Sequence, residues 1–583
     1  MNFLKNVLAV ITGLFVFSFI AFIGFFLVIA IIPASSNQTM VVSENSILRL
    51  NLSGEIHEKV PNDPFSEFLG ESAPMLSVID ASIAIRQAAS DDDIKGLYIR
   101  TGLLSSGYAS LTELREAIQE FKSSGKFVLA YGEFYSEKAY YLASIADEIY
   151  IQPEGSIEFN GISANITFYQ GAFEKLGVEP QIFRVGEFKG AVEPFIRKDL
   201  SPENRLQLET WLSSLNDVVI AEIAESRNLE VSTVREISNS MLVTSPASAK
   251  EHGLITDSFY ADQVENRLKE LADMEQDDDF NFVSTKDYYL NWSKNEPYAS
   301  DRVAVVVAEG EILGGDGTNY TIGSKKFAST LKNLRNNSKV KALVLRINSP
   351  GGGMTASDVI WREISLIADS IPVIASMGDY AASGGYYLAA PCDTIVCQST
   401  TLTGSIGVFG MLFNFGPFLT DKLGITHDVV RTGEYSDIFT VTRSLTDQEK
   451  EIIQHGVENS YETFIDKVST GRKRDNNDIK AIASGKIWHG QTALENGLVD
   501  VIGGLKDAIK IAAEAADLEE YSVVYYPEQK SFFEEIISEF GGQVQAIIRN
   551  RELGILEPFA GILDKARNYQ GTQARLPFEF ELN

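Results

Sequence analysis

The sequence predicts an α/β protein with two duplicated domains of parallel sheets and packed helices, preceded by one N-terminal transmembrane helix. Three observations support this prediction. An uncharged apolar run lies near the start, strand-like and helix-like stretches alternate through most of the chain, and segments of the first half recur in the second. A chain of 583 residues with 44% hydrophobic residues is long and apolar enough for two or three domains with sizeable cores.

The first element is an uncharged segment at residues 7–32. Its length of roughly 26 residues is enough to cross a bilayer as a helix. Lys5 precedes it and the next basic residue is Arg49, which favours a cytoplasmic N-terminus with the rest of the chain outside. A cleaved signal peptide is the alternative, but its apolar core is only about 7–15 residues long and ends in an Ala-x-Ala exit that is missing here. We therefore expect residues 1–33 to be a cytoplasmic stub and transmembrane anchor.

The two halves that follow share the same alternation of predicted strands and helices. In the second half, continuous apolar runs at 303–308, 342–347 and 373–376 predict buried strands. Residues 357–368 have apolar positions three and four apart, which predicts a helix. Strands that alternate with helices indicate βαβ units and a largely parallel sheet.

Sequence repeats connect the halves: residues 94–100 match 340–346, and 250–257 match 494–500. Self-similarity at this spacing indicates a duplicated domain rather than a solenoid. The expected divisions after the anchor are an N-terminal repeat at 34–285, a C-terminal repeat at 286–520 and a C-terminal helical tail at 521–583.

The repeat is most informative where its copies differ. Ser383-Gly-Gly in the second half stands where the first half has Glu137-Lys-Ala. Conversely, Lys189 in Gly-Glu-Phe-Lys stands where the second half has Ser436 in Gly-Glu-Tyr-Ser. One half keeps a serine on a glycine-rich turn and the other keeps a lysine, so together they could form one Ser–Lys pair per chain.

Ser383 follows a predicted strand at 373–377 and precedes a predicted helix at 385–390. A nucleophile at such a turn is accessible and lies at the positive end of the helix dipole. The alternative is that Ser383 only caps the helix. Gly384 and Gly385 are costly at a helix start, which favours a site where a ligand approaches the backbone closely.

A second motif, Pro350-Gly-Gly-Gly, leaves a predicted strand as a glycine loop. Backbone N–H groups in such a loop can converge on a developing oxyanion. A flexible loop is the alternative. The matching place in the first half, residues 101–107, lacks the glycine run, so the copy without the serine also lacks this loop.

Lys189 can be a general base only when neutral, so its pKa must fall far below the ordinary lysine value. Burial lowers a lysine pKa, and the apolar neighbours Phe188, Val192 and Phe195 could bury it. The alternative is a solvated surface lysine. No histidine lies near either motif in sequence, although a distant one such as His489 could approach in the fold.

Composition excludes several classes of function. The net charge of −30, from 50 basic and 80 acidic residues, argues against nucleic-acid binding and against docking on anionic lipid by charge alone. The two cysteines, Cys392 and Cys397, make neither a disulfide framework nor a four-ligand zinc site, and the five histidines lack metal-ligand spacing. We expect no metal and no cofactor.

Three motifs in order resemble signal peptide peptidase A, or protease IV, in its long duplicated form: residues 348–352, 378–387 and 402–407. The resemblance implies a membrane-anchored serine protease of the Clp/crotonase-like fold, with the serine from the second half and the lysine from the first. The family's Tyr-Lys-Ser-Ala-Val-Glu-Pro-Phe segment corresponds to residues 188–195, where Phe and Gly are departures and the lysine is kept. The family also implies a homotetramer that forms a dome on the membrane, with active sites facing inward.

The predicted site assigns one role to each of five residues. Neutral Lys189 takes the proton of Ser383, which attacks a peptide carbonyl, and the backbone N–H groups of Gly352 and Gly384 hold the oxyanion. Ser405, in Thr-Gly-Ser-Ile-Gly, is the candidate for orienting the lysine, and a plain turn serine is the alternative.

The expected function is that of a Ser–Lys endopeptidase in the bacterial inner (plasma) membrane, with the catalytic domain on the periplasmic side. Its substrates would be remnant signal peptides and other short apolar peptides, reached through the anchor in the lipid bilayer. One alternative is a crotonase-like acyl-CoA enzyme, and another is a non-catalytic membrane scaffold. The repeat further predicts one active site per chain, with neither half active alone.

Overall fold

The computed structural model describes residues 12–20, 42–60, 75–275, 281–295, 298–527, 571–576 and 581–582. Residues 12–20 are helical, and the rest of the predicted transmembrane segment at 7–32 lies outside the described residues. Within the described ranges, no helix combines the length and the apolar character needed to cross a membrane.

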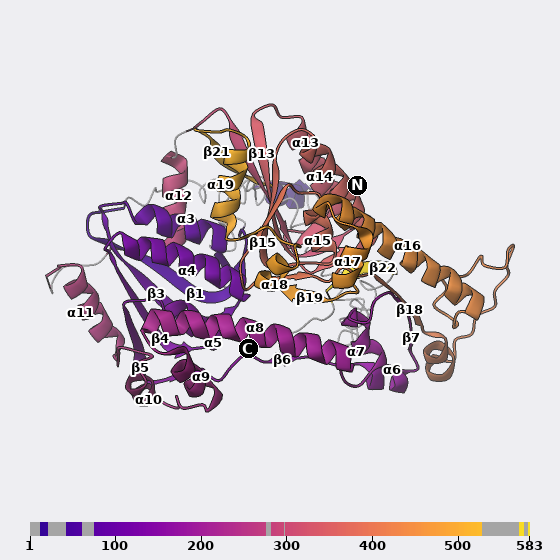
Figure 1. The fold of residues 1–583 in the computed structure, drawn as a ribbon, viewed down its shortest axis with the longest axis horizontal. Helices are drawn as coiled ribbons and strands as arrows, with labels where there is room; N and C mark the ends of the chain where they lie inside the picture. The colour runs from indigo at the N-terminus through magenta and orange to yellow at the C-terminus, as the bar shows by residue number, and fades with distance from the viewer. Residues whose placement is uncertain are drawn as a thin grey trace, which may run out of the picture.

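The first sheet is parallel throughout and comes from the first half (Figure 1). Its strand order is β2-β1-β3-β4-β5-β8, with β9 also paired to β1. The strands are Ser46–His57 (β1), Met75–Ser77 (β2), Ile94–Ser105 (β3), Phe127–Tyr135 (β4), Glu148–Ile157 (β5), Asp257–Ser258 (β8) and Asn281–Ser284 (β9).

The second sheet repeats this plan in the second half. Its order is β19-β17-β15-β13-β10-β21, with β16 paired to β15 and β20, and only the β17–β19 pairing in this described sheet is antiparallel. The strands are Arg302–Glu309 (β10), Val340–Ser349 (β13), Val373–Ala382 (β15), Thr394–Cys397 (β16), Leu402–Gly404 (β17), Ile487–His489 (β19), Val501–Ile502 (β20) and Ser522–Tyr526 (β21).

A third sheet joins the halves. Its order is β12-β11-β14-β22-β18-β7, so that β7 of the first half pairs with β18 of the second. The strands are Glu179–Arg184 (β7), Glu311–Leu313 (β11), Thr321–Gly323 (β12), Gly351–Gly353 (β14), Phe409–Asn414 (β18) and Gly571–Arg575 (β22). A short antiparallel pair is formed by Ala164–Asn165 (β6) and Glu581–Leu582 (β23).

Helices cover the sheets and fill the space between them. Those of the first half are Val78–Ala88 (α3), Tyr108–Ser123 (α4), Glu137–Ala143 (α5), Gln170–Leu176 (α6), Gly190–Val192 (η1), Glu193–Ile196 (α7), Pro202–Arg227 (α8), Val231–Asn239 (α9), Pro246–Glu251 (α10) and Ala261–Leu271 (α11). The later helices are Thr285–Asn295 (α12), Ser324–Arg335 (α13), Met354–Ala368 (α14), Gly384–Ala389 (α15), Phe418–Lys422 (η2), Asp447–Arg472 (α16), Asn476–Ile482 (α17), Gly490–Glu495 (α18) and Leu505–Ala515 (α19).

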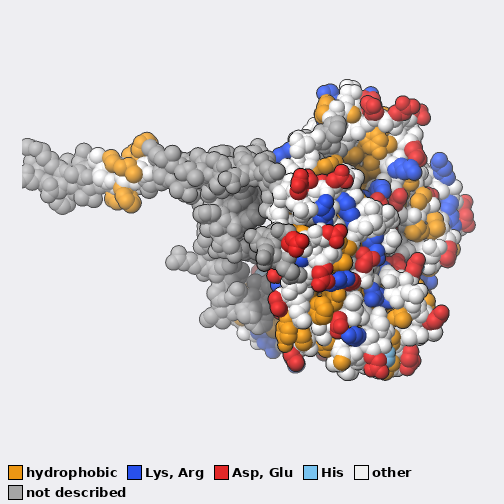
Figure 2. Space-filling view, turned by 90° about the vertical axis from the view of Figure 1, so that its left-hand side faces the viewer, with side chains coloured by type: hydrophobic (Ala, Val, Ile, Leu, Met, Phe, Trp, Pro, Cys, Tyr) orange, Lys and Arg blue, Asp and Glu red, His pale blue; other side chains and the backbone are white. Residues whose placement is uncertain are grey.

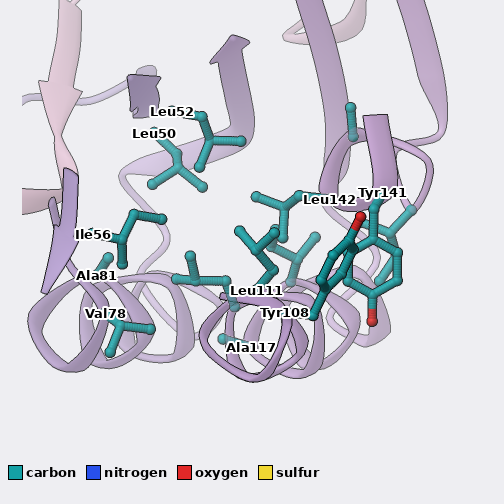
Figure 3. Packing of buried hydrophobic residues seen from close by; sticks show 14 of the residues in the cluster. Leu50, Leu52, Ile56, Val78, Ala81, Tyr108, Leu111, Ala117, Tyr141 and Leu142 are labelled. Carbon is teal, nitrogen blue, oxygen red and sulfur yellow. The ribbon is translucent and has the colours of Figure 1, made fainter. Parts of the chain in front are cut away.

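One buried core extends across both halves. Leu50 and Leu52 of β1 pack with α3 and α4, as Figure 3 shows. The same cluster takes in Leu505 and Ala508 of α19 and Val305 of β10, which belong to the second half. In Figure 1 the long helix α8 begins near α7 and runs beneath both sheets. The two halves are therefore packed together as one body.

A buried ion-pair cluster also ties the halves together. Arg346 of β13 is fully buried, with its Nε 2.8 Å from Glu58 and its Nη1 2.6 Å from Glu113, two carboxylates of the first half. Burial raises the pKa of Glu58 to about 7, although Arg346 acts in the opposite direction. Removing one partner would leave an uncompensated charge in the interior, so the cluster holds the two halves in register.

Acidic and basic side chains are interspersed on the surface. On the face in Figure 2, Asp and Glu lie among Lys and Arg, with scattered hydrophobic side chains. The acid excess is spread over this face and does not gather into a single patch.

The predicted mixed α/β fold with parallel sheets is confirmed. The predicted strands lie in β10, β13 and β15, and the predicted helix lies in α14. The repeat boundaries at 34–285 and 286–520 stay predictions.

The prediction of a helical tail at 521–583 is wrong where those residues are described. Ser-Val-Val-Tyr-Tyr forms β21, as β-branched and aromatic residues favour, and residues 571–575 form β22. β22 pairs on both sides with strands distant in sequence, which no local pattern reveals. The remaining residues of the tail lie outside the described ranges, apart from the short β23.

Candidate active site

Ser383 forms the junction between β15 and α15. Its backbone has φ 55° and ψ −113°, a positive-φ conformation that is unfavourable for any residue with a Cβ. Its side chain makes no capping hydrogen bond to α15, so the helix-cap interpretation is wrong for this structure. The sharp turn instead directs the hydroxyl into the interior, where the residue is fully buried.

Lys189 reaches this hydroxyl from the other half of the chain. It lies between β7 and η1, is fully buried, and places its Nζ 2.7 Å from Ser383 Oγ. Burial lowers the pKa of Lys189 well below the ordinary lysine value, because the charged form loses its hydration. The buried amine is therefore biased toward the neutral form that can accept a proton.

Ser405 completes the surroundings of the lysine nitrogen. Lys189 Nζ lies 2.9 Å from Ser405 Oγ and 3.1 Å from Ser405 O, and a carbonyl oxygen can only accept a hydrogen bond. A neutral amine has two N–H groups and one lone pair. When the N–H groups are donated to the two Ser405 oxygens, the lone pair is left to face the Ser383 hydroxyl.

Two glycines let the lysine side chain pack this tightly. A methyl group on Gly485 (φ +80°) would lie 2.8 Å from Lys189 Cβ, and one on Gly407 would lie 3.3 Å from Lys189 Cδ. Gly407 is the last residue of a motif that the sequence had marked, whereas nothing in the sequence pointed to Gly485. Neither position can carry a larger side chain without moving the lysine.

Gln207 of α8 connects the lysine loop to the second half. Its Nε2 donates to the carbonyl of Phe188 at 3.0 Å, and its Oε1 accepts from the backbone N–H of Ile487 at 3.2 Å. No motif in the sequence marks this residue, because its bridge joins two backbone groups that lie 19 and 280 residues away from it in the chain. The bridge orients the loop that carries Lys189.

The glycine loop lies against the start of α15. A methyl group on Gly351 (φ +97°) would lie only 2.7 Å from the Gly384 nitrogen, so the two backbones can approach this closely only with glycine. The N–H of Gly351 already donates to Ser349 Oγ at 3.2 Å. Gly352 and Gly384 therefore remain the candidate donors for an oxyanion in this corner.

His489 is not part of the hydroxyl's surroundings. In the described part of the chain, the hydrogen-bond partners of Ser383 Oγ are Lys189 Nζ and, at 3.4 Å, the Gly407 carbonyl. His489 pairs through β19 with β17, and burial lowers its pKa. Cys392 and Cys397 are free and buried.

The corresponding place in the first half carries no nucleophile. Glu137 stands there, its carboxylate accepts from the Gly161 N–H at 3.0 Å, and burial raises its pKa to about 7. Next to it, burial lowers the pKa of Lys138. Within the described part of the chain, the structure thus brings Ser383 and Lys189 together at the boundary of the two halves.

Comparisons with known proteins find similarity over most of the chain. The profile of "Peptidase family S49" matches residues 120–275 and 366–519, and two matched regions fit a duplicated form. "Protease 4" of Haemophilus influenzae is 35% identical over 516 residues, which cover 85% of this chain and 83% of that protein. "Serine protease SPPA, chloroplastic" of Arabidopsis thaliana is 33% identical over 553 residues, covering 92% and 78%. "Putative signal peptide peptidase SppA" of Enterococcus faecium is 35% identical over 210 residues, covering 36% and 61%.

Proposed function

Because the chain belongs to peptidase family S49 and is a serine protease, we propose that Ser383 is its nucleophile and Lys189 its general base. The observation that carries the proposal is the 2.7 Å distance between Lys189 Nζ and Ser383 Oγ in a fully buried site. A general base must lie within about 2.6–3.2 Å of the heavy atom whose proton it removes, and Lys189 Nζ lies within this distance of Ser383 Oγ.

The reaction begins when neutral Lys189 accepts the hydroxyl proton of Ser383. The serine oxygen attacks the peptide carbonyl, and the N–H groups of Gly352 and Gly384 donate to the oxyanion that forms. The ammonium of Lys189 then returns its proton to the leaving amine as the C–N bond breaks. Water hydrolyses the acyl-enzyme with Lys189 again as base, which regenerates the Ser383 hydroxyl.

Ser405 has a positioning role in this scheme. Its two oxygens accept the N–H groups of neutral Lys189, and they stabilise the ammonium once the proton has been transferred. Bonds to a charged donor are stronger than bonds to a neutral one, so this support grows as the transition state is approached.

The setting of the reaction is proposed on the resemblance and on the relatives' names. We propose that both halves have the Clp/crotonase-like fold, that residues 7–32 anchor the chain in the inner membrane, and that four copies assemble with their sites facing inward. The substrates proposed are remnant signal peptides, in keeping with the name of the Enterococcus faecium relative. The two alternative functions, a crotonase-like acyl-CoA enzyme and a non-catalytic membrane scaffold, are excluded because the chain is a serine protease.

A fluorophosphonate probe tests the proposed pair in the full chain. The probe should label Ser383, as peptide mapping would show, and Ser383→Ala should abolish labelling. Lys189→Met should slow labelling near neutral pH by a factor of about 100 or more, because general base catalysis contributes about 10²–10⁴-fold. Lys138→Met is the matched control. Lys138 is a buried lysine in the first-half segment that corresponds to the Ser383 turn, and this variant should label at the wild-type rate. Labelling of Ser383 at full rate in Lys189→Met would refute the pair.

A further inference from the structure

Strand β22 lies between two strands of the second half, next to the proposed active site. It pairs antiparallel with β14 through Gly351–Arg575, Gly352–Ala574 and Gly353–Gln573. On its other side it pairs antiparallel with β18, from Phe409–Gln573 to Met411–Gly571. β22 is thus an extended segment held by backbone pairing on both edges, which is how a groove between two strands binds a peptide.

The register of β22 aligns one of its peptide bonds with the glycine corner. A methyl group on Gly351 would collide with the carbonyl oxygen of Ala574, and one on Gly384 would lie 3.0 Å from the same oxygen. One residue beyond the strand, the N–H of Leu576 donates to the Pro350 carbonyl at 2.7 Å. A peptide carbonyl therefore lies beside Gly351 and Gly384, close to where the proposed mechanism places the oxyanion.

Arg575, directly after that carbonyl, makes an ion pair across the sheet. Its Nη1 lies 2.6 Å from Glu311 Oε1, and both side chains are largely buried. Glu311 belongs to β11, the strand beyond β14, so the arginine side chain has to pass over β14. Every residue of β14 is glycine, which leaves the space for this crossing.

We propose that β22 lies where a substrate strand binds, and that Glu311 selects a basic side chain at the residue directly following the cleaved bond. The inference rests on the proposed function, because it identifies the carbonyl beside Gly351 and Gly384 with the one that Ser383 attacks. Ala574, which is small and fully buried, then occupies the position of the substrate residue that forms the acyl-enzyme. Arg575 occupies the position of the residue that supplies the leaving amine.

The same geometry makes β22 a competitor of substrate. A peptide cannot pair with β14 and β18 while β22 occupies both edges, so binding requires β22 to leave. The ion pair between Arg575 and Glu311 further stabilises β22 in its position between β14 and β18. A substrate with a basic residue at the same position replaces that ion pair with its own.

Peptide cleavage tests the selection by Glu311. Three peptides of the form Gly-Thr-Gln-Ala-X-Leu, with X as Arg, Gln or Glu, differ only at the residue after the expected cleavage point. The full chain should cleave the Arg peptide about tenfold or more faster, in kcat/KM, than the Gln peptide. Glu311→Gln should abolish this preference and Glu311→Lys should shift it to the Glu peptide. Asp316→Asn, which removes an exposed carboxylate of the following loop, should keep the Arg preference.

The outcomes separate this inference from the proposed function. If Ser383 is labelled by the fluorophosphonate and all three peptides are cleaved equally, or the preference survives in Glu311→Lys, the inference is refuted and the proposed function stands. If Ser383 is not labelled in any variant, the proposed function fails and the inference fails with it.

A charge exchange tests the position of β22 by a second measurement. Arg575→Glu places two carboxylates together and should release β22, which raises the rate of Ser383 labelling several-fold. Combining Arg575→Glu with Glu311→Lys restores an ion pair of reversed polarity and should return labelling toward the wild-type rate. Equal labelling rates in the wild type, the single variants and the double variant would overturn the placement of β22 in the substrate groove.

Discussion

Replacing Ser405 by alanine removes one of the two oxygens that receive the N–H groups of Lys189. The Ser405 carbonyl remains, and alanine tolerates the φ of 50° as well as serine does, so the loop should keep its path. What is lost is one hydrogen bond, 2.9 Å long, to a nitrogen that becomes charged in the transition state.

The size of the effect follows from the charge. A hydrogen bond to a charged group contributes about 1.5–3 kcal/mol, and each 1.4 kcal/mol is about tenfold in rate. The kcat/KM of Ser405→Ala should therefore fall about tenfold to a hundredfold at the pH where activity is maximal. Ser144→Ala, which removes an equally buried hydroxyl in the first half, is the matched control and should leave kcat/KM unchanged.

The pH profile distinguishes orientation of the lysine from general packing. Under the proposed mechanism, activity should rise with pH as Lys189 loses its proton. The Ser405 hydroxyl stabilises the ammonium, so its removal lowers the pKa of Lys189 further and should move the acidic limb of kcat/KM to lower pH. A variant with unchanged kcat/KM, or with an acidic limb that moves upward, would refute the role assigned to Ser405.

Three further predictions concern stability, each measured by urea unfolding of the full chain. Lys189→Met should be more stable than wild type, and most so at pH values below the lowered pKa of Lys189. The gain should shrink as pH rises from that pKa toward the ordinary lysine pKa, because in this range only the unfolded wild type binds the proton. A stability difference that is independent of pH would contradict this prediction. Ser383→Gly should be more stable than Ser383→Ala by about 1 kcal/mol, because glycine relieves the positive φ, and the reverse order would show that the turn is unstrained. Arg346→Met should cost about 3–5 kcal/mol, because it leaves Glu58 and Glu113 buried without their cation, and a neutral result would mean that the cluster does not hold the halves together.

Local pattern was sufficient for the mixed α/β fold class, and the internal repeat was sufficient to pair Ser383 with Lys189, which the structure places in contact. The apolar runs of β10, β13 and β15 are buried on both faces, so they stand out in the sequence. Ser383 and Lys189 could be paired because the duplication exposes what each half keeps and what each half has lost. That comparison uses the sequence alone and does not require the distance between Ser383 and Lys189 in the fold.

Other parts of the site depend on contacts that only the folded chain creates. Gln207 acts through backbone groups, Gly485 matters because a lysine packs on it, and Glu311 faces Arg575 over a strand of glycines. None of these residues belongs to a motif or to a repeated segment that the sequence had singled out. The strand β22 was not predicted for the same reason, since its partner strands on both edges are more than a hundred residues away in the chain.

The division of the Ser–Lys pair between the halves has a consequence for how such a chain is made. Lys189 leaves the ribosome well before Ser383, so a growing or truncated chain carries a base without a nucleophile. Even the complete chain must first dock its halves, because the lysine nitrogen meets the hydroxyl only across their boundary. Under the proposed mechanism, folding must therefore be complete before the chain can cleave a peptide, and a nascent or partly unfolded molecule should be inactive.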